Sequence, residues 1–65
     1  ESKKDFIHKM SMSLKECNEV KYWIDLLFET GYIKNEEFDF IYPKCVELQK
    51  IITTIIKSAK RNLYT

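Results

Sequence analysis

The amino-acid sequence predicts an all-α protein, an antiparallel helical hairpin that forms half of an up-and-down four-helix bundle. Apolar residues recur at alternating spacings of four and three in two long segments, which places each set on one face of a helix. Only one glycine, Gly31, and one proline, Pro43, occur among the 65 residues, which leaves little room for loops or strands. Each apolar face is wider than a lone hairpin can cover, so we expect further helices to pack against it.

Two apolar stripes define the expected helix faces. The first stripe consists of Phe6, Met10, Ser13, Cys17, Val20, Ile24 and Leu27. The second stripe consists of Ile41, Cys45, Leu48, Ile52, Ile55 and Ala59. Apolar neighbours widen both stripes, and two of them, Met12 and Trp23, are candidate interface residues, with packing inside the core as the alternative. We expect contact with at least two more helices, and assembly into a homo-oligomer is the expected source of stability for so short a chain.

The first helix is expected over about residues 3–30. Ser2 suits its N-cap, and Asp5 three residues later gives a capping-box pattern. Gly31 is expected to end the helix, because glycine readily adopts the left-handed conformation that follows many helices. The connection over residues 31–34 is short, so the second helix must return antiparallel to the first.

The second helix is expected over about residues 36–61, with Asn35 as its N-cap and acidic residues in its first turn. Pro43 interrupts the pattern, because proline lacks an N–H group and its ring collides with the carbonyl of Asp39. We expect a kink or a short break near Pro43, and a functional hinge there is the alternative. The chain is thus interpreted as one helical segment over residues 1–65.

The two cysteines, Cys17 and Cys45, both fall on the apolar stripes. Packed helix axes lie about 8–10 Å apart, whereas the Cα atoms of a disulfide lie about 4.4–6.8 Å apart, so we expect two buried free thiols. Free thiols fit the reducing cytoplasm. No apolar run approaches the roughly 20 residues that cross a bilayer. The sequence therefore predicts a soluble cytoplasmic protein that does not bind membranes.

Catalytic and metal-binding patterns are not found in the sequence. The one histidine, His8, has no cysteine or carboxylate at ligand spacing, and the Glu-x-x-His pattern of di-metal bundles is absent. No glycine-rich phosphate loop and no Ser/His/Asp arrangement occurs. We therefore expect no enzymatic activity, no catalytic residues, no metal site and no cofactor.

Charge is distributed unevenly along the expected hairpin. Its open end, residues 1–15 and 50–65, carries eight Lys/Arg and two Asp/Glu, which gives a net charge of +6. Its closed end, residues 16–49, carries three Lys/Arg and eight Asp/Glu, which gives a net charge of −5. A basic end can bind the phosphate backbone of RNA or DNA, and a solvated lysine-rich surface is the alternative. The candidate nucleic-acid-binding residues are Lys3, Lys4, Lys9, Lys57, Lys60 and Arg61. Phe6 and Tyr64 could stack on bases at the same end.

Five sequence segments resemble a known family. They are SKKDF (residues 2–6), SLKECNEVKYWIDLL (13–27), TGYI (30–33), EEF (36–38) and IIKSAK (55–60). Together they are similar to the C-terminal half of the four-helix-bundle proteins encoded in 23S ribosomal RNA intervening sequences, whose relatives include the accessory variability protein of diversity-generating retroelements.

The resemblance implies a homopentamer with a basic surface that binds nucleic acid or a nucleic-acid-processing protein, and no enzymatic activity. The first two helices of the family have no counterpart in this sequence, so either the chain is a fragment or another copy completes the bundle. The expected function is therefore that of an oligomeric bundle protein that binds RNA through its basic end. A structural or adaptor bundle that binds another protein without nucleic acid is the alternative.

Overall fold

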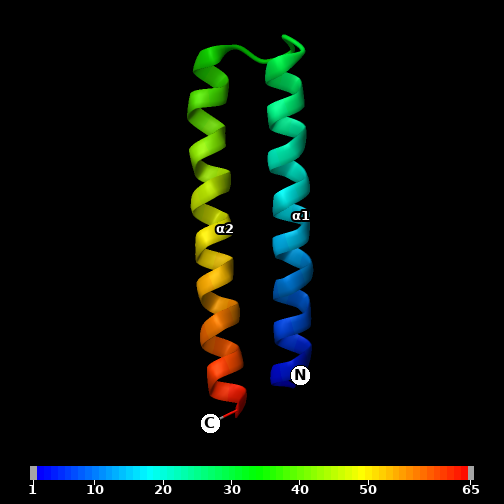
Figure 1. The fold of residues 1–65 in the computed structure, drawn as a ribbon, viewed down its shortest axis with the longest axis vertical. Helices are drawn as coiled ribbons and strands as arrows, with labels where there is room; N and C mark the ends of the chain where they lie inside the picture. The colour runs from blue at the N-terminus through cyan, green and yellow to red at the C-terminus, as the bar shows by residue number, and fades with distance from the viewer. Residues whose placement is uncertain (1, 65) are drawn as a thin grey trace.

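Two long antiparallel helices make up the structure, a computed structural model that describes the backbone of residues 2–64 and the side chains of residues 2–62. Helix α1 (Lys3–Glu29) and helix α2 (Asn35–Tyr64) lie side by side along a rod with extents of 48 × 15 × 14 Å (Figure 1). The connecting turn lies at one end of the rod, and both ends of the chain lie at the other. The predicted all-α helical hairpin is confirmed.

Both ends of α1 are capped by the residues that the sequence predicts. Ser2 Oγ accepts a hydrogen bond from the backbone N–H of Asp5 at 3.1 Å. At the other end, Gly31 has a φ of 85°, its N–H donates to the carbonyl of Phe28, and the N–H of Tyr32 donates to the carbonyl of Leu27. These two bonds form a Schellman motif, which satisfies carbonyls that the last turn leaves without helical partners.

The left-handed conformation of Gly31 leads to a prediction about stability. Gly31→Ala should lower the free energy of unfolding by about 1 kcal/mol, because a Cβ atom disfavours positive φ. No heavy atom lies within 4 Å of the position that a Cβ would take, so the cost comes from the backbone alone. Urea unfolding followed by helical circular dichroism measures it. Gly31→Asn is the matched variant and should lose less, since asparagine tolerates this conformation; an alanine variant as stable as the parent would contradict the prediction.

Helix α2 begins at Asn35, one residue earlier than the sequence predicts. The N–H of Phe38 donates to the carbonyl of Lys34 at 2.9 Å, which makes Lys34 the N-cap and places Asn35 inside the helix. The prediction that Asn35 is the N-cap is therefore wrong. The reason is a side chain further along: Glu37 Oε1 accepts from the backbone N–H of Lys34 at 2.8 Å, as in the reciprocal half of a capping box.

Helix α2 is continuous through Pro43. Two features are expected at this position, a kink or a short break. The prediction of a short break is therefore wrong, and the kink stays a prediction. Proline cannot donate to the carbonyl of Asp39. One residue later, Lys44 Nζ donates to the neighbouring carbonyl of Phe40 at 3.4 Å. The helix ends at Tyr64, beyond the expected limit near residue 61.

The core is a narrow seam between the two helices. Its buried residues are Cys17 and Ile24 on α1 and Cys45, Ile52 and Ile56 on α2. Cys17 Sγ donates to the carbonyl of Cys45 at 3.7 Å, and both thiols are free, as predicted. Towards the turn, the rings of Phe28, Phe38 and Tyr42 stack in series with centroid separations of 4.3 and 4.7 Å.

The seam is rotated from the centre of the predicted stripes. Some stripe residues are buried or half-buried at regular spacing, namely Met10, Cys17, Ile24, Cys45, Ile52 and Ala59. Between these residues, the seam contains residues that follow the predicted stripe residues by one position in the sequence. They are Leu14, Lys21, Phe28, Tyr42, Gln49 and Ile56. The stripe residues that these replace are mostly exposed: Ser13, Val20, Leu27, Ile41 and Leu48. Each stripe therefore covers both the seam and a neighbouring surface.

Candidate nucleic-acid interface

Exposed stripe residues from both helices lie on one side of the hairpin, which we call the apolar face. It consists of Phe6, Val20 and Leu27 on α1 and of Ile41, Leu48 and Ile55 on α2. Leu27 and Ile41 line one hollow of about 560 Å³, and Phe6 and Ile55 line another of about 410 Å³, so the two helices contribute to the same side. Leaving aside Ile55, these side chains are 37–49% exposed.

The opposite side of the hairpin carries hydrophilic residues, and we call it the polar face. It consists of Lys4, Ser11 and Asn18 on α1 and of Gln49, Lys50, Thr53, Lys57 and Lys60 on α2. Gln49 Nε2 donates to Asn18 Oδ1 across this side of the seam. Lys50 and Lys57 line a hollow of about 460 Å³ together with Gln49. The two sides of the rod are thus chemically different.

Three of the predicted nucleic-acid-binding residues lie on the polar face at the open end. Lys57 is one of them. Lys4 precedes Ser11 by seven residues and Lys60 follows Thr53 by seven, and seven residues make two helical turns, which places each lysine on the same side as its neighbour. All three side chains are exposed. The three lysines therefore lie on the same side of the hairpin, separate from the apolar face.

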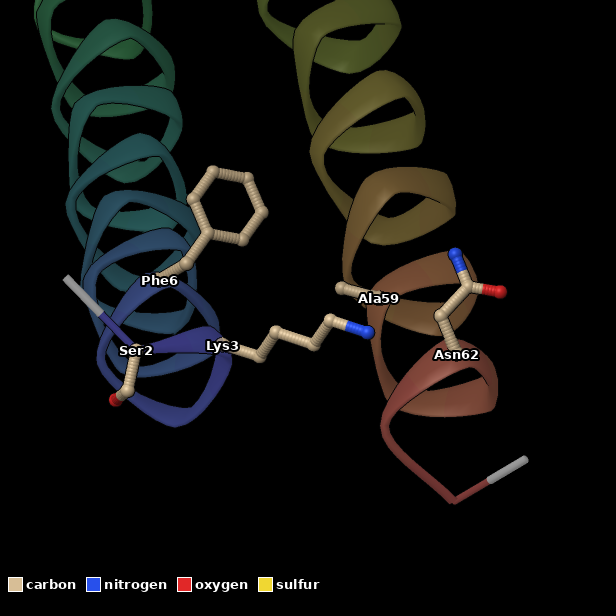
Figure 2. A pocket seen from close by; sticks show the side chains of 5 residues that line it. All are labelled: Ser2, Lys3, Phe6, Ala59 and Asn62. Carbon is tan, nitrogen blue, oxygen red and sulfur yellow. The ribbon is translucent and has the colours of Figure 1, made fainter.

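Lys3 lies elsewhere, at the end of the apolar face. Its side chain extends from α1 towards α2 and lines a hollow of about 370 Å³ with Phe6, Ala59 and Asn62 (Figure 2). The remaining two candidates, Lys9 and Arg61, are exposed at the same end of the rod. The six predicted residues therefore share one end of the molecule without sharing one surface.

Lys50 is a cation of the polar face that sequence reasoning did not select as a site residue. Its spacing of seven from Lys57 is the signal that could have identified it, because two helical turns align the two side chains. Phe6, which was expected to stack on bases, lies on the apolar face and away from these lysines. The side chain of Tyr64 lies outside the described residues.

The two candidate interface residues are both exposed on the single hairpin. Met12 is 53% and Trp23 55% exposed, so neither is packed in the seam. Trp23 makes an edge-to-face contact with Tyr22 at a centroid separation of 5.3 Å. Their role in an interface stays a prediction.

The described residues contain no group of three or more His, Cys, Asp or Glu side chains that could hold a metal ion, and His8 is exposed. Neither α1 nor α2 contains, in its described part, an apolar stretch long enough to cross a lipid bilayer.

Comparison with known proteins identifies the family. A model of the 23S rRNA-intervening sequence proteins matches residues 1–54, which takes in α1, the turn and α2 as far as Thr54. No curated protein and no solved structure is a significant match. The relation to the accessory variability protein stays a prediction. Because the family model matches most of the 65 residues, the chain belongs to the family of 23S rRNA-intervening sequence proteins.

Proposed function

We propose that this protein is a non-enzymatic bundle protein of the cytoplasm that assembles through its apolar face and binds the phosphate backbone of RNA with its open end. One observation supports the RNA-binding part: Lys4, Lys57 and Lys60 are all exposed on the polar face, on the other side of the hairpin from the apolar face. Assembly into a pentamer, which the resemblance implies, stays a prediction.

The arrangement of the polar-face lysines suits binding to the phosphate backbone of a nucleic acid and not recognition of a base sequence. Lys50 and Lys57 lie two turns apart on one helix, about 10 Å along its axis, and Lys60 continues the row. Lysine is a flexible point charge that binds phosphate without the planar hydrogen-bonding pattern by which arginine reads a guanine. Binding is therefore expected to be weakly dependent on sequence and strongly dependent on salt.

Removing two polar-face lysines tests the proposal. The Lys57→Gln/Lys60→Gln variant should bind a structured RNA more weakly at low salt and reduce the slope of log affinity against log salt by about 2, one unit for each lost phosphate contact. Filter binding over a range of salt concentrations measures both quantities. Both glutamines are good helix formers, so the helical circular dichroism should be unchanged.

The matched control removes the same charge from the closed end. Lys34→Gln/Lys44→Gln lowers the net charge by the same two units but should leave RNA binding nearly intact, because these exposed side chains lie far from the basic end. An equal loss in both variants would show that net charge alone governs binding. If the parent protein binds no RNA at low salt, the proposal is wrong, and the alternative of a protein-binding adaptor remains.

A further inference from the structure

We propose that the polar face binds double-helical RNA across its minor groove, with lysines on the two phosphate strands and uncharged side chains on the 2′-hydroxyl groups between them. This inference rests on the RNA binding of the proposed function, and it names the form of the RNA and the groove. A-form RNA has a wide and shallow minor groove that displays 2′-hydroxyls, and proteins recognise double-stranded RNA largely through these hydroxyls and the flanking phosphates.

Lysines border the polar face on both helices. On α2 they are Lys50, Lys57 and Lys60. On α1, Lys15 follows Lys4 by eleven residues, which is close to three helical turns, so both lysines lie along the same side of that helix. All of these side chains are exposed. Two rows of cations on packed helices, whose axes lie about 8–10 Å apart, can follow two phosphate strands on either side of a groove.

Uncharged side chains that form hydrogen bonds lie between the two rows. They are Ser11 and Asn18 on α1 and Gln49 and Thr53 on α2. Gln49 Nε2 donates to Asn18 Oδ1 across the seam, and Thr53 Oγ1 donates to the carbonyl of Gln49 at 2.7 Å. The bond between the two amides does not use the NH₂ group of Asn18 or the side-chain oxygen of Gln49. A 2′-hydroxyl both donates and accepts, so it can bond to either group.

The polar face lacks the side chains by which proteins hold single strands. None of the residues that define it is aromatic, whereas binding of single-stranded RNA depends on bases that stack on aromatic rings. Tyr22, seven residues after Lys15, lies beyond this face in the closed end, which has a net charge of −5. The composition of the face therefore favours a duplex, in which the bases stack on one another.

Acidic residues limit the site along the rod. Asp25 follows Asn18 by seven residues, and Asp39 precedes Thr53 by fourteen, so both lie on the side of the polar face but in the closed end. Carboxylates repel phosphate groups, and none of the residues that define the polar face is acidic. The duplex is therefore expected to lie over the open half of the rod.

A comparison of matched nucleic acids tests the inference. The probes are a blunt RNA duplex, a DNA duplex of the same sequence, and an unpaired RNA with the same number of phosphates. At equal salt we expect the RNA duplex to bind about tenfold more tightly than either of the others, because it alone presents paired phosphate strands and 2′-hydroxyls in one groove. Fluorescence anisotropy of the parent protein with each labelled probe measures these affinities.

Two variants of unchanged charge identify the surface. Ser11→Ala/Asn18→Ala should weaken binding of the RNA duplex about fivefold and leave the affinity for the DNA duplex unchanged, because the lost groups contact 2′-hydroxyls. Alanine is a good helix former, so the helical circular dichroism should not fall. The matched control is Ser58→Ala/Asn62→Ala, the same residue types beside the hollow of about 410 Å³ on the apolar face, and it should bind both duplexes as the parent does. Equal losses in the variant and the control would contradict the proposal.

The possible outcomes separate this inference from the proposed function. If the protein binds neither form of RNA at low salt, both are wrong. If unpaired RNA binds as tightly as the duplex, the proposed RNA binding stands and the double-helical target is overturned. If the RNA and DNA duplexes bind equally tightly, or if Ser11→Ala/Asn18→Ala weakens both to the same extent, contact with the 2′-hydroxyls of the minor groove is overturned.

Discussion

Ile52→Ala is expected to lower the free energy of unfolding by about 3 kcal/mol, whereas the same substitution at the adjacent Ile51 should cost less than about 1 kcal/mol. Ile52 is 6% exposed and packs with Cys17 and Ile56 in the seam, so the truncation leaves a cavity that α1 cannot readily fill. Ile51 is 48% exposed. For a hairpin of this size such a loss is a large part of the total stability. Urea unfolding followed by helical circular dichroism measures both variants.

The pair is closely matched, since the two residues are identical and adjacent on one helix. Equal losses would show that the helices do not pack along the seam described above. The experiment should be repeated at several protein concentrations, because folding and assembly are coupled when a partner binds only the folded state. A loss at Ile52 should persist at every concentration, whereas any loss that arises from weaker assembly should change with it.

The secondary structure could be predicted from the sequence because its signals are local. Ser2 and Gly31 mark the two ends of α1 through bonds to residues within five positions, and the sequence contains all of those residues. The sequence predicts the start of α2 one residue late for a related reason. Asparagine is a good N-cap in general, but the side chain of Glu37 caps Lys34 directly.

The seam could not be placed from periodicity alone. A stripe contains apolar residues of the seam and apolar residues of the exposed apolar face alike. Its centre therefore lies between the seam and the apolar face. Lys21 and Gln49 occupy seam positions without being apolar; Lys21 Nζ lies 5.4 Å from the ring centroid of Tyr42, and Gln49 bonds to Asn18. Such contacts depend on which residues the two helices bring together, and spacing within one helix does not record them.

The sequence predicts at which end of the molecule the candidate site lies. It does not predict how the residues of that end divide between the polar face and the apolar face. Net charge along the chain is enough to identify the basic end, because a hairpin with a short turn brings its two termini together. Dividing that end into a polar face with Lys4 and Lys57 and an apolar face with Lys3 requires the rotation of each helix about its axis. That rotation follows from the position of the seam. Because the predicted stripes are centred away from the seam, they do not show which cations share a face.

Leu48→Lys is expected to abolish assembly and leave the hairpin helical. Leu48 lies on the apolar face one turn from Cys45, whose carbonyl bonds to Cys17 near the middle of the rod. In an assembly through the apolar face the substitution buries an unpaired charge in each copy, which should weaken association by more than about a hundredfold. Leucine and lysine have similar helix propensities, so the change should not unfold α2. Light scattering over a range of concentrations measures the effect.

The control for this variant adds the same charge to the other side of the rod. Ser11→Lys lies on the polar face, which assembly leaves in solvent, and it should associate as the parent protein does. The comparison separates a buried charge from a general effect of a more basic protein. The two variants add the same positive charge but on different faces of the rod. If Leu48→Lys associates as well as the parent protein, the apolar face is not the interface. Loss of association in Leu48→Lys alone would support that face as the interface.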